Sequence, residues 1–275
     1  MQSNYTSKCI DRMRFNYTGF LKHVRNVFSR RPDFLSTKLL WYIRQICLPW
    51  LVLPVVVKHK NRAKFYLSSD PIDDKVLWGL YVKFHDLYFP PEIKTSLPDA
   101  LFVDIGAHHG YYTIAALHQY SGIRIIAVEP DPINFQLLKR NLILNRSHDN
   151  VEVYQAALGK GNGPGWLTMS EEGSWGNYLG DLEENSIKVQ VLSIINILGS
   201  RIPYLVKCNC EGGEFEIIPE LFRLEIFPEY ILLFVHPQKV NEGELLKIID
   251  DASYEVTALF SSMDHPRYIC RKINT

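Results

Sequence analysis

Two apolar runs that each end at an acidic residue constrain the fold of this chain more than any other feature. The first, LFVDIGAHHG, passes Asp104 and enters a turn that contains Gly106 and Gly110. The second, IIAVEPD, ends at Glu129, about 20 residues beyond the glycines. Glycine lacks a Cβ and tolerates positive φ, so it suits a sharp turn that leaves room for a ligand. The pattern predicts a nucleoside site in which Glu129 accepts hydrogen bonds from ribose hydroxyls.

The turn lacks one glycine of the dinucleotide-binding pattern. It reads D-x-G-x-x-x-G, whereas a helix that binds a pyrophosphate at its N-terminus usually follows G-x-G-x-x-G. This difference favours an adenosine-bearing cofactor without phosphates, and S-adenosylmethionine has that chemistry. In such a site Asp104 is expected to bind the loop or the ammonium group of the cofactor. Gly106 and Gly110 are expected to admit its methionine moiety.

Four blocks of sequence extend the pattern beyond the glycine turn. VDIGAHHGYYTI, AVEPDPINFQLLKRNLILN, VYQAALG and LVKCNCEGGEFEII occur in this order. Together they resemble the FkbM family of S-adenosylmethionine-dependent methyltransferases, over about residues 53–272. The resemblance implies methylation of hydroxyl oxygens on sugars, lipids or polyketides. It also implies that Ala157, in the AALG block, lies close to the adenine of the cofactor.

Apolar runs and helical periods alternate along the chain, which is typical of an α/β protein. With the resemblance, this predicts a Rossmann-like class I methyltransferase fold: a mostly parallel central sheet, helices on both faces and a C-terminal antiparallel hairpin. Strands are expected at Leu101–Asp104, Ile125–Glu129, Val151–Gln155, Tyr204–Asn209, Tyr230–Val235, Tyr254–Phe260 and Arg267–Lys272. Helices are expected at Tyr111–Gln119, Ile133–Asn145 and Glu242–Asp251, with Asp131 as N-cap of the second and Pro132 in its first turn.

The chain divides into three regions, and at 275 residues it can bury a substantial core. Residues 1–52 are basic and apolar and are expected to be helical. Residues 53–100 are expected to form a hairpin over 55–69, turning near Lys60 and Asn61, and a helical lead-in. Residues 101–275 form the cofactor-binding domain.

An insert within that domain, Lys160–Gln190, is rich in glycine and polar residues. We expect it to form loops over the site. Its Trp175 and Asn177 are candidate substrate contacts, although an aromatic residue in a loop is as often a packing residue.

The N-terminal quarter is strongly basic, with 13 Lys and Arg against 2 Asp and Glu in residues 1–64. It contains the apolar segment 39–57, in which Arg44, Pro49 and Pro54 interrupt the run, so we reject a membrane span. A helix packed on the catalytic domain is favoured, and contact with a membrane interface is the second interpretation. Because no secretory signal is recognised, we expect a cytoplasmic protein, with peripheral membrane contact through residues 39–57 as the alternative.

Five cysteines, at positions 9, 47, 208, 210 and 270, are odd in number and form no C-x-x-C pair. They indicate neither a disulfide framework nor a zinc site, and no metal is expected. Cys208 and Cys210 are two apart on a predicted strand. Their side chains should therefore face the same side, as small buried apolar groups.

Catalysis is harder to derive from the sequence. Methyl transfer depends mainly on the alignment of acceptor, methyl and sulfur, but the proton of a hydroxyl acceptor also needs a base. His236, Glu211 and His109 are the leading candidates, and His108 and Glu214 are others. The spacing singles out none of them. His236 also suits a turn before proline, and Glu214 suits the start of a solvated helix.

The chain departs from the family pattern at three positions. Where related chains usually read K-I-D-V-E-G, residues 207–212 read K-C-N-C-E-G, so the amide of Asn209 replaces a carboxylate. Ser193 stands where an Asp usually opens the preceding helix, and Phe234 stands where a Glu usually precedes the position of His236. If those carboxylates carry metal or proton chemistry, turnover is impaired. Cofactor binding should survive, because Glu129 and the glycine turn are intact.

Four functions are compatible with the sequence. A methyltransferase that acts on a hydroxyl of a small molecule, glycan or lipid is favoured, because all four blocks support it. A catalytically weak relative that binds the cofactor and serves as a binding or assembly module is the second. A nucleic-acid methyltransferase is the third, because the basic N-terminal region could bind phosphates. It is less favoured, because the basic residues there are mixed with a long apolar run, unlike a phosphate-binding surface. A nicotinamide-dependent dehydrogenase is the fourth, and the missing glycine argues against it. The acceptor and the oligomeric state stay open.

Overall fold

In the computed structural model of the chain, the described residues are 54–56, 63–66, 76–77, 80, 88–170, 173–236, 241–260 and 266–273. Two compact units divide the chain, Met1–Leu51 and Val52–Thr275, and every described residue belongs to the second. The expectations for residues 1–52, and for most of the apolar segment 39–57, therefore lie outside the described residues. Among the helices that the structure does describe, none has the length and apolar character needed to cross a membrane.

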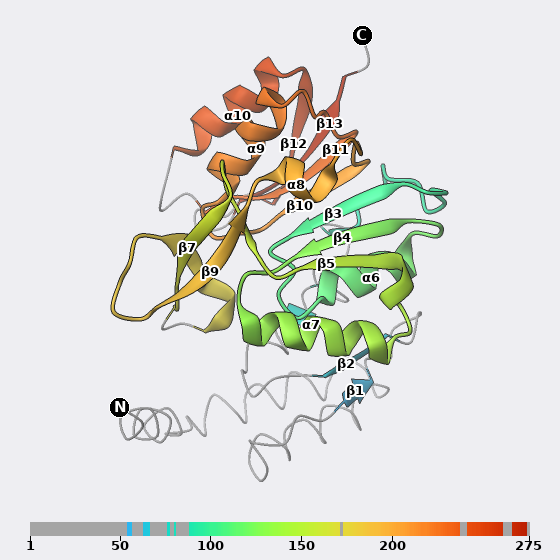
Figure 1. Ribbon diagram of the computed structural model, residues 1–275. Coiled ribbons are helices and arrows are strands. Elements are labelled where there is room, and N and C mark those ends of the chain that lie inside the picture. Colours follow the sequence, from blue (N-terminus) through green and yellow to red (C-terminus); the bar gives the residue numbers. More distant parts are fainter. Residues whose placement is uncertain are drawn as a thin grey trace, which may run out of the picture. The chain divides into compact units, whose positions relative to one another are not determined.

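A seven-stranded sheet forms the centre of the second unit (Figure 1). In spatial order its strands are β12 (Tyr254–Phe260), β13 (Arg267–Lys272), β11 (Tyr230–Phe234), β10 (Leu205–Cys208), β3 (Leu101–Ile105), β4 (Arg124–Val128) and β5 (Val151–Tyr154). From β11 to β5 all neighbours are parallel. The last strand, β13, is antiparallel to both β11 and β12. This confirms the predicted Rossmann-like class I arrangement with its C-terminal antiparallel hairpin.

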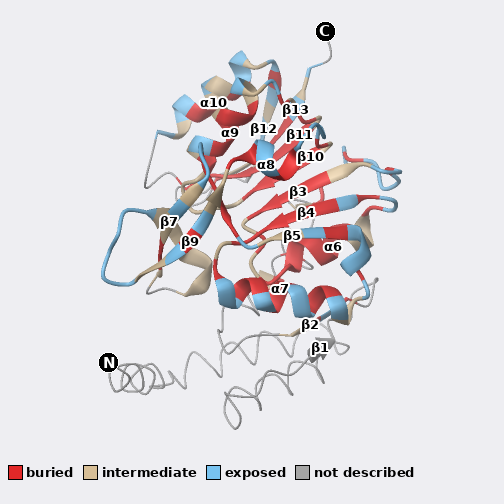
Figure 2. Ribbon diagram, in the orientation of Figure 1, coloured by how far each residue is buried: buried red, intermediate tan, exposed pale blue. Residues whose placement is uncertain are grey.

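Helices cover both faces of this sheet (Figure 1). One face carries α6 (Tyr111–Gln119) and α7 (Pro132–Leu144), and the other carries α8 (Ile194–Leu198), α9 (Glu214–Arg223) and α10 (Glu242–Asp251). Side chains alternate along each strand, so the two faces have separate packing. In β3, Val103 and Ile105 join the apolar core beneath α8, α9 and α10, whereas Phe102 and Asp104 contact residues of the α6 face. Figure 2 shows the buried residues concentrated in these central strands.

The start of α7 follows the sequence prediction. Asp131 is its N-cap, and the carboxylate oxygen Oδ1 accepts hydrogen bonds from the amides of Ile133 and Asn134. Pro132 occupies the first turn, where its missing amide hydrogen costs nothing. Both predictions are confirmed.

The insert between β5 and β10 forms a second sheet, which corrects the expectation of loops. Its strands, in spatial order, are β6 (Ala157–Leu158), β9 (Ser186–Leu192), β7 (Gly163–Thr168) and β8 (Tyr178–Gly180). Glycine and proline obscure the strand character of β7, but SIKVQVL in β9 alternates as a strand does. Ala157, Leu167 and Val189 form a small apolar core for this sheet. A short 3-10 helix, η4 (Ser174–Gly176), lies between β7 and β8, and another, η3 (His148–Asn150), precedes β5.

The predicted hairpin at the start of the unit is also present. β1 (Pro54–Val56) pairs antiparallel with β2 (Lys64–Tyr66), whereas the predicted turn at Lys60 and Asn61 lies outside the described residues. Two asparagines of the α7 region hold β2. The side chain of Asn141 accepts a hydrogen bond from the amide of Tyr66, and Asn145 bonds both backbone groups of Lys64.

A buried ion pair joins β3 to β10 at the centre of the main sheet. Lys207 Nζ lies 2.8 Å from Asp104 Oδ1, and the two side chains are 3% and 1% exposed. Asp104 Oδ2 accepts a hydrogen bond of 2.6 Å from the hydroxyl of Thr113 on α6. Lys207 Nζ also donates to the carbonyl oxygen of Gly106 at 2.9 Å. The pair therefore holds two strands, a helix and the loop after β3 in one arrangement.

Lys207→Met should lower the free energy of unfolding by about 3–5 kcal/mol, because it leaves the carboxylate of Asp104 buried without its cation. Urea denaturation followed by circular dichroism measures the change. The control is the double variant Asp104→Asn with Lys207→Met, which removes both charges and keeps an acceptor for Thr113. It should recover much of the loss. A single variant as stable as the wild type would contradict the role given to the pair.

Candidate functional site

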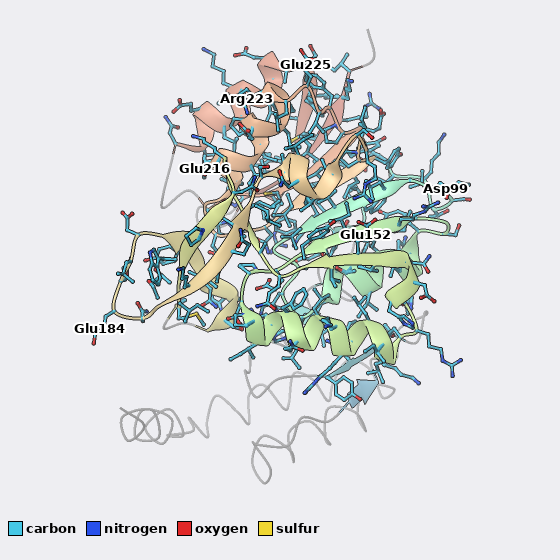
Figure 3. All side chains as sticks on the ribbon, viewed as in Figure 1. Asp99, Glu152, Glu184, Glu216, Arg223 and Glu225 are labelled. Carbon is cyan, nitrogen blue, oxygen red and sulfur yellow. The ribbon has the colours of Figure 1, made fainter. Side chains whose placement is uncertain are left out.

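The segments that follow β3, β4 and β10 meet at one edge of the main sheet. These strands are parallel, so their carboxyl ends share that edge, where open α/β sheets bind their ligands. Figure 3 marks the opposite edge, where Asp99 and Glu152 lie beside the starts of β3 and β5. The second sheet extends from the carboxyl edge, as Figure 1 shows for β7 and β9.

The loop after β3, residues 106–110, needs both of its glycines for packing. Gly106 has a φ of 73°, and a Cβ there would lie 1.9 Å from the carbonyl oxygen of Asn209, which follows β10. Gly110 has a φ of 79°, and its Cβ would lie 2.5 Å from Leu138 Cδ1 on α7. The glycines let β10 and α7 approach the loop closely. This packing accounts for both residues without a contact to the methionine moiety.

Glu129 follows β4 and places a buried carboxylate at the same edge, with 5% of the residue exposed. Its Oε2 accepts a hydrogen bond of 2.7 Å from the amide of His108. Its Oε1 accepts one of 3.0 Å from the amide of Asp131 and one of 3.4 Å from Asn134 Nδ2. Burial raises the pKa of Glu129 to about 7, although these hydrogen bonds oppose the shift.

These features fit the ribose of an adenosine-bearing cofactor. Within the described part of the chain, no cation forms an ion pair with Glu129, so its hydrogen bonds compensate the burial of its charge only in part. A carboxylate accepts about four hydrogen bonds, and Oε2 accepts one from the described residues. Neutral hydroxyl donors would therefore complete the site without a change of net charge. The residues present fit S-adenosylmethionine.

Two other expected cofactor ligands are bound within the protein. Asp104 contacts Lys207 and Thr113, and it holds the base of the glycine loop through them. Ala157 lies in β6, and its side chain packs in the small core of the second sheet. Internal bonding therefore accounts for Asp104, and packing accounts for Ala157.

Both histidines of the loop are engaged by neighbouring side chains. His109 is 1% exposed, with Nδ1 3.1 Å from the hydroxyl of Tyr111 and Nε2 2.9 Å from Asn134 Oδ1. His108 stacks on it with ring centroids 3.7 Å apart, and His108 Nε2 lies 2.9 Å from the hydroxyl of Ser174. Because His109 is buried in this network, the geometry gives no support to its expected role as general base.

Glu211, His236 and Glu214 form a cluster where β10 and β11 end. His236 Nε2 lies 3.0 Å from Glu211 Oε1, and His236 Nδ1 lies 3.0 Å from Glu214 Oε1. The amide of His236 also donates to Glu214 Oε1 at 2.8 Å. The side chain of Glu214 is fully buried, whereas that of Glu211 is 17% exposed. The structure thus joins two of the three predicted catalytic residues, and Glu211 is the carboxylate that solvent reaches.

The two carboxylates fix the charge of His236. Burial lowers the pKa of His236, but the hydrogen bonds and charges of Glu211 and Glu214 outweigh it and raise the pKa to about 9. Burial raises the pKa of Glu214, and the hydrogen bond and charge of His236 outweigh it and hold that pKa below its usual range. His236 is therefore an imidazolium at neutral pH and lacks the lone pair that a base needs. This charge state favours Glu211 over His236 as the candidate base.

Two features of this region were not predicted from the sequence. Glu214 was a candidate base, with the start of a solvated helix as the alternative, and it begins α9 as a fully buried acceptor. Lys207 was not singled out, although a lysine within the apolar run LVKC is a signal for a buried acidic partner. Which carboxylate that partner would be could not be read from the spacing of the residues.

The three departures from the family pattern occupy structural positions. Asn209 places its backbone against the glycine loop, and its backbone N–H donates to the carbonyl oxygen of Ile105. Ser193 is at the N-cap position of α8, and its hydroxyl donates to Asn196 Oδ1. Phe234 ends β11 and packs on the ring of Tyr88.

The cysteine prediction is confirmed for Cys208, which is fully buried in the apolar core. Cys210 follows β10, is partly buried and packs against the same core. Their sulfur atoms lie 3.4 Å apart.

Comparison with protein families decides the identity of the chain. A family model described as the methyltransferase FkbM domain matches residues 104–256, which is more than half of the sequence. The chain belongs to the FkbM methyltransferase family. As a member of this family it is a methyltransferase that uses S-adenosylmethionine. The comparison with curated proteins gave no match.

Solved structures similar to this FkbM-family chain are distant. The methyltransferase FkbM from Methylobacillus flagellatus is 19% identical, with a TM-score of 0.46; the match covers 67% of this chain and 47% of that protein. The precorrin-6y C5,15-methyltransferase from Geobacter metallireducens is 18% identical, with a TM-score of 0.42; the match covers 69% of this chain and 87% of that protein. M. jannaschii TYW2 in complex with AdoMet is 16% identical, with a TM-score of 0.46; the match covers 81% of this chain and 88% of that protein. Likenesses of this size assign neither substrate nor site residues to this chain.

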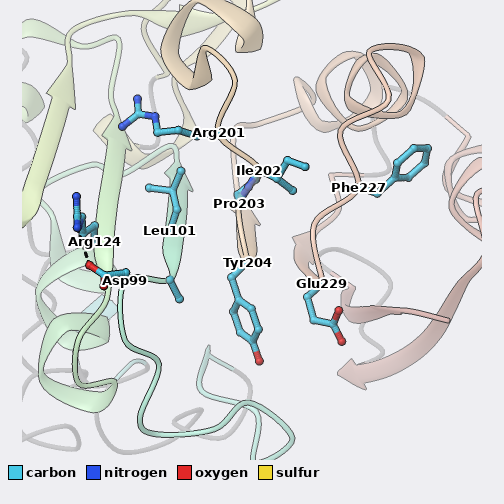
Figure 4. A pocket seen from close by; sticks show the side chains of 10 residues that line it. Asp99, Leu101, Arg124, Arg201, Ile202, Pro203, Tyr204, Phe227 and Glu229 are labelled. Carbon is cyan, nitrogen blue, oxygen red and sulfur yellow. Dashed lines mark hydrogen bonds and ion pairs between the residues drawn. The ribbon is translucent and has the colours of Figure 1, made fainter. Parts of the chain in front are cut away.

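A surface pocket of about 580 Å³ lies at the opposite edge of the sheet of this FkbM-family chain (Figure 4). It is lined near the starts of β3, β4 and β10 by residues that include Leu101, Arg124 and Tyr204. Arg124 forms an exposed ion pair of 2.6 Å with Asp99 beside it. Because parallel sheets bind cofactors at the carboxyl ends of their strands, we do not assign the cofactor to this pocket.

His236→Gln should reduce the pH dependence of stability. A pKa raised from 6.5 to about 9 stabilises the fold fully below pH 6.5, and this contribution is lost as the pH rises through 9. The free energy of unfolding of the wild type should fall by about 3 kcal/mol over that window through this group. The fall should be smaller in the variant. Urea denaturation across this pH range measures both proteins, and parallel curves would contradict the assigned charge state.

Proposed function

We propose that this methyltransferase transfers the methyl group of S-adenosylmethionine to a hydroxyl oxygen of a sugar, lipid or other small metabolite. The observation that carries the proposal is the cluster of Glu211, His236 and Glu214 beside the loop assigned to the cofactor. A hydroxyl acceptor must lose its proton during methyl transfer, and this cluster offers a carboxylate for that proton.

The cofactor supplies an electrophilic methyl group when bound, so the protein mainly has to position the acceptor and remove its proton. Glu129 is proposed to accept hydrogen bonds from the ribose hydroxyls. The glycine loop, held by Asp104 and Lys207, is proposed to form the floor beside it. Ala157 is proposed to shape the adenine side through the small core in which it packs.

Glu211 is proposed as the group that accepts the proton. It is the more exposed carboxylate of the cluster, and the 3.0 Å contact to His236 orients it. Its carboxylate can accept the proton that leaves the acceptor hydroxyl. His236 is then a positioning residue, and Glu214 fixes His236 from the buried side.

The proximity of the two parts supports this assignment. Asn209 touches the glycine loop at Gly106, and Glu211 lies two residues further along the chain. Glu211 therefore stands at the edge of the sheet where the cofactor is expected, as an in-line displacement with a nearby proton acceptor requires.

Glu129→Gln should weaken the binding of S-adenosylmethionine by about 1–3 kcal/mol, because an amide replaces a charged acceptor of the ribose hydroxyls. Hydroxyl donors favour the ionised carboxylate. In the protein without cofactor, burial raises the pKa of Glu129 to about 7. Binding to the wild type near pH 6.5 should therefore release protons, and affinity should rise with pH up to about 7. Calorimetry in buffers of different ionisation enthalpy measures this release. Equal affinity and equal proton release in the variant would refute the site.

Glu211→Gln should lower the turnover number by at least about 100-fold and leave the affinity for S-adenosylmethionine unchanged. The measurement is release of S-adenosylhomocysteine with a panel of sugar and lipid hydroxyl acceptors, with mass spectrometry of the products. Glu216→Gln is the matched control, because Glu216 is an exposed acid on α9, the helix that begins shortly after Glu211, and it is labelled in Figure 3. Turnover that survives in Glu211→Gln would remove Glu211 from the mechanism. Cofactor binding without turnover of any acceptor would favour the catalytically weak relative.

A further inference from the structure

The segment between β7 and β8 is attached to both loops of the cofactor site. This segment contains η4 and Asn177, and it belongs to the inserted second sheet. One hydrogen bond runs from it to the loop after β3, and another runs to the loop after β4. An insert that only covered the site would need neither bond.

Asn177 uses both ends of its side-chain amide. Its Oδ1 accepts a hydrogen bond of 2.9 Å from the amide of Ser170, and its Nδ2 donates one of 2.9 Å to Asp131 Oδ2. Asp131 divides its carboxylate in the same way, because Oδ1 caps α7 and Oδ2 receives the insert. A residue at 177 must therefore donate and accept at once, which an amide does and a carboxylate or an aliphatic side chain does not.

Ser174 makes the second attachment. Its hydroxyl lies 2.9 Å from Nε2 of His108, in the glycine loop. His108 has a φ of 52°, a left-handed conformation that is unfavourable for a residue with a side chain. The contact to Ser174 fixes the ring of a residue whose backbone is already constrained.

The insert reaches the two residues whose backbone amides hold the carboxylate of Glu129. The amide of His108 donates to Oε2, and the amide of Asp131 donates to Oε1. Two hydrogen bonds from one segment thus reach His108 and Asp131, and the backbone amides of these two residues bind the carboxylate of Glu129.

We propose that Asn177 and Ser174 are positioning residues for Glu129, and that they couple cofactor binding to the order of the inserted sheet. The inference rests on the proposed role of Glu129 in binding the ribose. Because coupling between two sites is reciprocal, bound S-adenosylmethionine stabilises the insert, and the attached insert raises the affinity for S-adenosylmethionine. The insert carries Trp175 between the two contacts, so the coupling extends to this candidate substrate contact.

The test measures the affinity for S-adenosylmethionine by calorimetry in variants of the attachment. Asn177→Leu should weaken binding on the order of tenfold, although the residue is assigned no contact with the cofactor. Asn177→Asp should weaken it more, because a second carboxylate then faces Asp131. Asn185→Leu is the matched control, because the exposed side chain of Asn185 donates a hydrogen bond to Met169 within the same insert. This variant should bind S-adenosylmethionine as tightly as the wild type does.

An exchange of the two side chains separates positioning from general destabilisation. In the double variant Asp131→Asn with Asn177→Asp, the donor and the acceptor change places, and the α7 cap and the bond from Ser170 keep their acceptors. Affinity should return to within about threefold of the wild type, whereas each single variant should bind more weakly. Thermal unfolding of all variants reports stability beside affinity.

Hydrogen exchange of the wild-type protein gives a second readout that needs no variant. Backbone amides of residues 173–180 should exchange more slowly when S-adenosylmethionine is added. Unchanged exchange there, or unchanged affinity in Asn177→Leu, overturns the coupling. Glu129→Gln distinguishes the two levels: if it binds as tightly as the wild type, the proposed ribose site itself fails. If it binds weakly while Asn177→Leu does not, only the coupling fails.

Discussion

The ion pair of Asp104 and Lys207 is the interaction on which the rest of the described structure depends. Each of two charges taken out of water costs several kcal/mol unless the geometry compensates for it. The register of β3 and β10 sets the two residues directly opposite each other, and Thr113 and the carbonyl of Gly106 satisfy their remaining groups. A slip of one residue would carry one charge to the other face of the sheet, so the pair also specifies the register. The glycine loop and the Glu211 cluster both begin within a few residues of it, and their relative position follows.

The central sheet could be predicted because its strands are continuous apolar runs. Such runs are typical of parallel sheets that helices cover on both faces. The second sheet could not, because the glycines and proline of β7 broke the run, although the alternation in β9 was available. For the site, the position of Glu129 after its strand was readable from spacing. The partner of Asp104 was not, since Lys207 lies 103 residues away. The burial of Glu214 was equally hidden, because an acid at a helix start is favourable in solvent too.

Glu129 and the cluster of Glu211, His236 and Glu214 lie at the same edge of the sheet, but their environments shift carboxyl pKa values in opposite directions. This difference suits the roles proposed for them. Burial dominates at Glu129 and raises its pKa, so this carboxylate benefits from neutral donors. At the cluster, His236 supplies a positive charge and holds the pKa of Glu214 low. Environments that push titratable groups apart in this way are how one fold separates binding from proton transfer.

Two residues of this edge keep a left-handed backbone without being glycine: His108, with φ of 52°, and Glu211, with φ of 51°. Each such conformation costs about 1–2 kcal/mol, and the surrounding hydrogen bonds maintain it. Glycine at either position would relax the backbone, but it would delete a side chain that the proposed chemistry uses, together with the contact of Glu211 to His236 or of His108 to Ser174. The most relaxed version of this fold is therefore not its working version. Backbone relaxation at these two positions and the proposed chemistry therefore make opposite demands on the residue type.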